Sequence, residues 1–186
     1  FVVTPGGRWT TVPWFSYSPD GNHPAFFVRA EKTRTLVMQN VLNRNIDKRI
    51  DMRTVDDPES PDISPDGPRI AFAALQGGTG DIFIVDLVTE EVTNVTRDRF
   101  ADSAPTWSPD GSYLLYLARI SGYEKLFKLD LKTGQKTQVT FGTHDDGAAQ
   151  FVDADTIVFA STAMDPSQPV DPEVARNGNI YNIWTL

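Results

Sequence analysis

The chain has 186 residues, 40% of them hydrophobic, and contains no cysteine. This size and apolar content suit a globular domain with its own core, and the missing cysteines exclude disulfides and thiolate metal sites. The formal net charge is −8, which disfavours nucleic acid and anionic membrane surfaces as partners, because both repel an acidic protein. No apolar run approaches the ~18 residues of a membrane span.

A four-residue motif, Ser-Pro-Asp-Gly, recurs at residues 18–21, 64–67 and 108–111. The copies begin 46 and then 44 residues apart, and a further step of 44 leads to a degenerate Val-Asp-Ala-Asp at 152–155. Proline presets the backbone of the first turn position, aspartate accepts local N–H groups, and glycine takes the left-handed conformation. Each copy therefore predicts a hairpin turn, and a repeated turn explains the three aspartates better than a catalytic role does.

Short strands recur in the same order after each turn. The first set is predicted at residues 25–28, 70–74, 114–118 and 157–160, and the second at 36–40, 82–86, 126–130 and 183–186. Polar turns then lead to alternating strands, as at 91–96 and 135–140. Four strands in about 40–45 residues are typical of a β-propeller blade, whose sheet buries its faces by stacking against its neighbours.

These units resemble the TolB-like, WD-like β-propeller repeat. The resemblance rests on the Ser-Pro-Asp-Gly turns and on Ile-Phe-Ile-Val-Asp-Leu at 82–87 and Leu-Phe-Lys-Leu-Asp-Leu at 126–131. We expect an all-β propeller of about four four-stranded antiparallel blades, the last one incomplete, as part of a larger ring. The expected blades are approximately 14–54, 60–98, 104–142 and 148–186, with 1–13 as a previous outer strand or as a closing strand plus linker.

Strand alternation sorts the connections onto the two faces of such a disc. The Ser-Pro-Asp-Gly turns share one face, and the connections between blades share the other, where acidic residues gather with few basic ones. We expect the following residues to bind a partner there: Asp56, Asp57, Glu59, Asp102, His144, Asp145, Asp146, Asp165, Asp171 and Glu173. The last three belong to a long loop at 163–178, a usual place for recognition. Solvated loops of an acidic protein are the alternative interpretation.

The sequence favours a non-enzymatic interaction scaffold. It has no Gly-x-Ser-x-Gly elbow and no zinc-type histidine spacing, so we expect no catalytic residue, metal or cofactor in this chain. The expected partner is a protein or peptide, with a basic segment favoured by charge, and the ring would be closed by the rest of a parent chain or by a second copy in a homodimer. The resemblance implies a periplasmic or extracellular setting. The alternatives are an accessory propeller of a larger peptidase or hydrolase, and a metal- or carbohydrate-binding propeller.

Overall fold

The computed structural model describes residues 10–30, 33–163 and 181–186, which form fifteen β-strands and no helix. The first sheet contains β1 (Thr10–Tyr17), β2 (Pro24–Ala30), β3 (Thr33–Gln39) and β4 (Ile46–Asp51). The second contains β5 (Asp56–Ile63), β6 (Arg69–Gln76), β7 (Thr79–Asp86) and β8 (Val92–Asn94). The third contains β9 (Asp102–Trp107), β10 (Tyr113–Ile120), β11 (Tyr123–Asp130) and β12 (Lys136–Gln138). The fourth contains β13 (Asp146–Phe151), β14 (Ile157–Ser161) and β15 (Asn182–Thr185).

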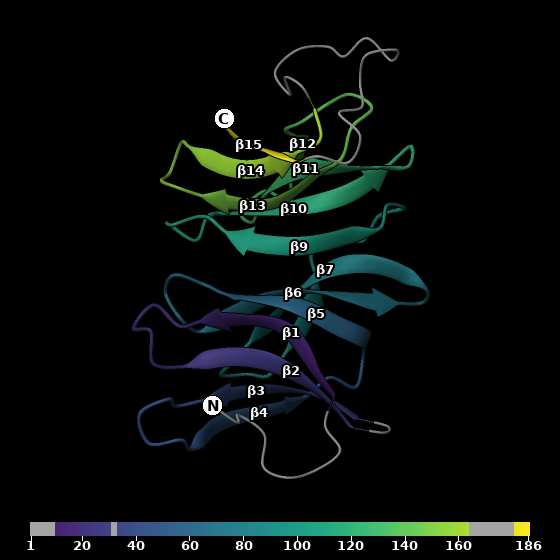
Figure 1. Ribbon diagram of the computed structural model, residues 1–186. Coiled ribbons are helices and arrows are strands. Elements are labelled where there is room, and N and C mark those ends of the chain that lie inside the picture. The colour runs from purple at the N-terminus through teal and green to yellow at the C-terminus, as the bar shows by residue number, and fades with distance from the viewer. Residues whose placement is uncertain (1–9, 31–32, 164–180) are drawn as a thin grey trace.

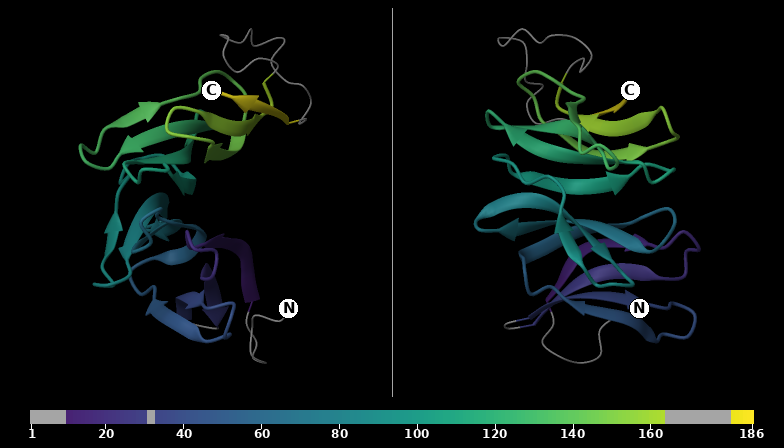
Figure 2. Two further views of the ribbon diagram at one scale, coloured as in Figure 1. Left: turned by 90° about the vertical axis from the view of Figure 1, so that its left-hand side faces the viewer. Right: turned by 180° about the vertical axis from the view of Figure 1, so that it is seen from behind.

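The four sheets are arranged as the blades of an open propeller. Every sheet is antiparallel with its strands in chain order. The sheets follow an arc in which the first strand of each, β1, β5, β9 or β13, lies on the concave side (Figures 1 and 2). The expected all-β propeller is therefore confirmed, and its fourth blade has three strands among the described residues. Residues 1–9 lie outside the described part, whereas Thr10 already belongs to β1.

The three Ser-Pro-Asp-Gly motifs form the predicted hairpins on one face of the disc, the left-hand side of Figure 1. In the third copy, the Ser108 hydroxyl donates to Asp110 Oδ1 at 2.6 Å, and the Ser112 N–H donates to the same oxygen at 3.0 Å. Gly111 has a φ of 71°, in the left-handed region that glycine tolerates best. The hydroxyl and backbone hydrogen bonds lower the pKa of Asp110 to about 2, so the motif aspartate is a turn residue.

The hydrophobic core lies between consecutive sheets. Phe27 of β2 contacts Phe72 of β6, with ring centroids 5.3 Å apart, and both side chains are almost fully buried. The next interface contains Tyr116 of β10, and the last contains Phe159 of β14. Burying a large side chain of this kind contributes about 1.5–3 kcal/mol. Each sheet thus depends on its neighbour for stability, as the repeat predicts.

The inner strands contain a repeated irregularity that shapes the concave surface. Ser60, Ala104 and Ala148 occupy the same repeat position in β5, β9 and β13, with φ values of 49°, 49° and 48°. Pairing with the next strand shifts register at each of these sites, which identifies β-bulges. A bulge changes the direction of the neighbouring side chains. Here it lies between the start of each inner strand and the end that leads into the Ser-Pro-Asp-Gly hairpin.

Asp62 links three blades through hydrogen bonds. It lies in β5, where Oδ1 accepts from the Ser16 hydroxyl of β1 at 3.0 Å. Its Oδ2 accepts from the Thr106 hydroxyl of β9 at 3.1 Å and from the Trp107 N–H at 2.8 Å. Burial raises the pKa of Asp62 in spite of these bonds. The carboxylate therefore holds the inner strands of the first three sheets side by side.

We expect Asp62→Ala to lower the free energy of unfolding by about 2–3 kcal/mol, because it leaves several donors without an acceptor. Asp62→Asn should cost less, since the amide oxygen still accepts from Trp107 and no charge is buried. Urea denaturation followed by tryptophan fluorescence measures both. Glu59→Ala, an exposed change in the same strand, serves as the control and should stay within about 0.5 kcal/mol of the parent. Equal losses for Asp62→Ala and Glu59→Ala would contradict the bridging role.

Candidate functional site

Two adjoining cavities open on the disc face opposite the Ser-Pro-Asp-Gly turns. The first, of about 330 Å³, lies between the first two sheets, and the second, of about 400 Å³, lies between the second and third. Both are bordered by Asp57 and Glu59, near the start of β5. Concave surfaces of this size are the usual places for ligands and peptide side chains on a rigid scaffold.

The first cavity balances acidic and basic groups. Arg29 and Arg34, from the end of β2 and the start of β3, line it together with Phe27, Val28 and Pro58. Arg29 Nη1 lies 3.1 Å from Asp57 Oδ1, and Arg34 Nη1 lies 3.1 Å from Asp56 Oδ1. These carboxylates are therefore largely neutralised by the chain itself.

The second cavity is acidic. Its lining contains four carboxylates and neither lysine nor arginine: Asp57, Glu59, Asp102 and Glu124. Arg119 approaches Glu124 Oε1 at 2.7 Å, whereas Oε2 of the same side chain is buried without a hydrogen-bond partner among the described residues. The remaining lining is small or apolar, with Ala73, Ala74 and Leu75 of β6, Gly78 of the β6–β7 turn and Gly80 of β7.

Asp102 is the most perturbed group at this cavity. The residue is 4% exposed, and neither carboxylate oxygen has a hydrogen-bond partner within the described part of the chain. Burial raises the pKa of Asp102 to about 7. The neighbouring Thr96 hydroxyl and the Lys136 ammonium offset part of this rise, and repulsion by Asp98 and Asp81 adds to it. The nearby cation, Lys136, is engaged elsewhere, because its Nζ lies 2.6 Å from Asp98 Oδ2 and also bonds the Thr96 carbonyl.

The contact between two neighbouring sheets is called a seam here. The seam between the third and fourth sheets, one repeat after that of Asp102, contains a buried ion pair. Lys125 Nζ lies 2.9 Å from Asp146 Oδ2, and the two side chains are 2% and 0% exposed. The Thr140 hydroxyl donates to the same oxygen at 2.6 Å, and His144 Nε2 lies 3.4 Å from Oδ1. Burial lowers the pKa of both Lys125 and His144. The cluster is closed to solvent and holds the third and fourth sheets together.

The structure divides the predicted site residues into three groups. Asp57, Glu59 and Asp102 meet around the acidic cavity, and Asp56 is exposed beside it, paired with Arg34. His144 and Asp146 are buried, and Asp145 accepts from the Glu124 N–H at 3.0 Å. Asp165, Asp171 and Glu173 lie outside the described residues.

The alternative interpretation of these residues as solvated loops is wrong for Asp102, His144 and Asp146, which are buried. The segment from Asp56 to Asp62 lies in β5 (Asp56–Ile63), Asp102 begins β9 and Asp146 begins β13. The inner strands must enter each sheet beside the preceding blade, which buries their first residues. Asp102, Asp146 and His144 thus belong to the seams between blades, and only Asp56, Asp57 and Glu59 remain exposed.

Sequence reasoning missed Glu124, Lys125 and the two arginines of the first cavity. The repeat contained a signal for the first two, because the turns between second and third strands share the face of the blade connections. Lys125 aligns with Asp81 at the 44-residue spacing, so the change from acid to base at one repeat position was visible. Its pairing with Asp146 depends on contacts between sheets, which no repeat alignment contains.

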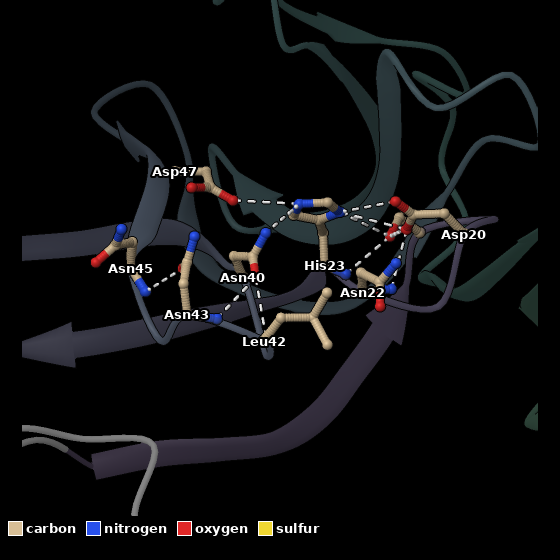
Figure 3. Close-up of polar contacts among 9 residues, drawn as sticks. Asp20, Asn22, His23, Asn40, Leu42, Asn43, Asn45 and Asp47 are labelled. Atoms are coloured by element: carbon tan, nitrogen blue, oxygen red, sulfur yellow. Dashed lines mark hydrogen bonds and ion pairs between the residues drawn. The ribbon is translucent and has the colours of Figure 1, made fainter.

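On the opposite face, His23 lies between Asp20 and Asp47 (Figure 3), and Ser18 is close to it, so that a serine, a histidine and aspartates come together. His23 Nδ1 lies 3.4 Å from Ser18 Oγ, and its Nε2 lies 3.3 Å from Asp47 Oδ2. However, the Ser18 hydroxyl donates to Asp20 Oδ1 at 2.5 Å and accepts from the His23 N–H. Ser108 makes the same two bonds in the third repeat. The hydroxyl is therefore committed to the turn, and the arrangement does not make an activated nucleophile.

The described residues contain no group of three histidines or acids placed to hold a metal ion. In the same part of the chain, no helix is long and apolar enough to cross a membrane.

Comparison with known proteins decides the family. A family model described as the TolB beta propeller domain matches residues 10–178. The chain belongs to this family. The TolB-type repeat expected from the sequence is thereby confirmed. A search of curated proteins gives no match.

Solved structures show the same fold. TolB from Acinetobacter baumannii is similar with a TM-score of 0.75 and 19% identity, over 98% of this chain and 42% of that chain. The β-propeller domain of the Trilobed protease from Pyrococcus furiosus has a TM-score of 0.63 and 16% identity, over 98% and 56%. An acylaminoacyl peptidase from Pyrococcus horikoshii has a TM-score of 0.62 and 18% identity, over 96% and 31%. This TolB-type chain thus spans little more than half of these proteins at most, and such identities show the fold alone.

Proposed function

We propose that this TolB-type propeller segment is a non-catalytic module that binds a protein or peptide, through a basic segment, on the face opposite the Ser-Pro-Asp-Gly turns. The observation that supports this most is the cavity of about 400 Å³ lined by four carboxylates and no basic side chain. The overall charge of −8 adds long-range attraction for a basic partner. The Ser18 hydroxyl beside His23 is committed to its turn, and the described residues contain no cluster of histidines or acids placed to hold a metal ion. The resemblance to TolB carries with it the expectation of a periplasmic setting.

Fluorescence polarisation with labelled peptides of one length tests the proposal. A lysine-rich peptide should bind, and an acidic and a neutral peptide should not. Because the contacts are charged and partly exposed, raising the salt from 50 to 300 mM should weaken binding by roughly tenfold. Binding of all three peptides alike, or of none, would contradict the proposal.

A pair of double variants locates the binding face. Asp57→Asn with Glu59→Gln removes two charges at the cavities, whereas Glu91→Gln with Asp155→Asn removes two charges from exposed turns on the hairpin face. The first double variant should lower the affinity for the basic peptide by about threefold to tenfold, and the second should lower it by less than twofold. Equal effects would mean that net charge, and not this face, attracts the peptide.

An accessory propeller of a larger peptidase is the second candidate. It is favoured by the match to the acylaminoacyl peptidase, of which this chain corresponds to 31%. A parent gene that also encodes a hydrolase domain would select this role, in which the acidic face would orient substrates.

A further inference from the structure

We propose that the acidic cavity between the second and third sheets takes one lysine or arginine side chain of a peptide partner, with Asp102 as its buried counter-ion. The inference rests on the proposed function and deepens it by assigning the residue recognised. It follows from comparing two equivalent seams of the propeller.

The repeat places the same groups at both seams, with one exception. Asp102 and Asp146 each begin an inner strand, 44 residues apart, and Asp81 and Lys125 occupy the same position of the third strand in consecutive blades. In the later seam, the Lys125 ammonium supplies the cation for Asp146 at 2.9 Å. In the earlier seam, the corresponding side chain is Asp81, which accepts from Asn94 Nδ2 at 3.0 Å and brings a second negative charge.

The earlier seam is therefore acidic where its counterpart is neutral. Both oxygens of Asp102 are buried without a hydrogen-bond partner among the described residues, and a buried carboxylate in this state carries a large desolvation cost. Lys136 offsets this cost only in part and from a distance, because its ammonium is held by Asp98 and the Thr96 carbonyl. A cation from outside the described residues would complete the seam as Lys125 completes the next.

The cavity beside Asp102 has the lining that a long basic side chain requires. Ala73, Ala74 and Leu75 offer apolar surface for the methylene stem, which packs well against such groups. Glu59 lies exposed at the rim and forms no ion pair within the described residues, and Glu124 keeps one oxygen free of Arg119. An incoming ammonium or guanidinium would meet these carboxylates before it reaches Asp102.

Titration of the ¹⁵N-labelled chain with two capped tripeptides tests the assignment by NMR. Acetyl-Ala-Lys-Ala-amide should shift the amide signals of Gly78, Gly80, Ala101 and Ser103 in a saturable way. The norleucine analogue has the same stem without the ammonium and should bind at least about tenfold more weakly, since charge-assisted hydrogen bonds are lost. Asp102→Asn and Glu59→Gln should each lower the affinity for the lysine peptide by about threefold or more. Asp155→Asn, the same charge change on the opposite face, should leave this affinity unchanged.

Three results would overturn the assignment. These are equal binding of the lysine and norleucine peptides, shifts confined to other loops, and full affinity in a folded Asp102→Asn variant. If long basic peptides still bound while the cavity amides did not respond, the proposed function would stand and the cavity assignment would fall. If no basic peptide bound anywhere, both would fall.

Discussion

Replacing Lys125 with alanine is expected to lower the free energy of unfolding by about 3–5 kcal/mol, the largest effect of any single change we consider. The ammonium of Lys125 and the carboxylate of Asp146 are buried together between the third and fourth sheets. Removing the cation leaves the carboxylate in a site where water cannot solvate it, with the Thr140 hydroxyl as its hydrogen-bond donor and His144 Nε2 3.4 Å away. Urea denaturation at pH 7 measures the loss.

Two further variants identify the cause of that loss. Lys132→Ala removes an exposed lysine from the β11–β12 turn and should change stability by less than about 0.5 kcal/mol. Combining Lys125→Met with Asp146→Asn removes both charges at once and should restore part of the stability, because no unpaired ion is then buried. A double variant as unstable as the sum of its single variants would show that packing, and not charge, dominates at this seam.

Replacing Asp102 with asparagine is expected to stabilise the protein, increasingly so at higher pH. An ordinary aspartate titrates near 4, whereas burial raises the pKa of Asp102 to about 7. Between these values the folded state retains a proton that the unfolded state has lost, so this group lowers stability as the pH rises from 4 to 7. A pKa difference of one pH unit corresponds to about 1.4 kcal/mol, and we expect Asp102→Asn to gain about 2–4 kcal/mol at pH 8 and almost nothing at pH 4.

Thermal unfolding of parent and variant from pH 4 to pH 8 measures this difference. The charged and titratable groups around Asp102 include Asp81, Asp98, Lys136 and Tyr116, together with the other carboxylates of the cavity, Asp57, Glu59 and Glu124. They are the same in both proteins. Asp155→Asn, on an exposed turn, should run parallel to the parent throughout. A stability difference that does not change with pH would mean that Asp102 does not ionise in this range.

The two seams show how a single substitution in a repeat changes the role of a position. Where the third strand carries Lys125, the aspartate of the next blade is neutralised within the chain. Where it carries Asp81, the equivalent Asp102 remains unpaired among the described residues, at the edge of a cavity. A group that lowers stability beside a cavity is consistent with the proposed site, because a bound cation would recover part of the cost of burying the charge.

The sequence predicts the region of the candidate site, but not how its side chains are arranged or which of them are buried. Asp57, Glu59 and Asp102 were predicted together because strand alternation assigns their segments to one face of the disc. Asp146 and His144 were included for the same reason, and the structure buries both. Charged residues before a strand look like a solvated loop in one dimension, and only the approach of the preceding blade determines which of them lose contact with water.

Blade number, strand order and the face on which each turn lies were already encoded in the order of the amino acids. Those features follow from local chemistry, such as the turn of Asp110 and Gly111, and from apolar strands that recur at a fixed spacing. Stacking of the sheets was needed to establish how the inner strands bulge at Ser60 and its equivalents, how Asp62 joins three blades, and which buried aspartate has a cation. These details depend on atoms that are about 45 residues apart in the chain and only a few ångströms apart in space, so they arise when neighbouring blades come into contact.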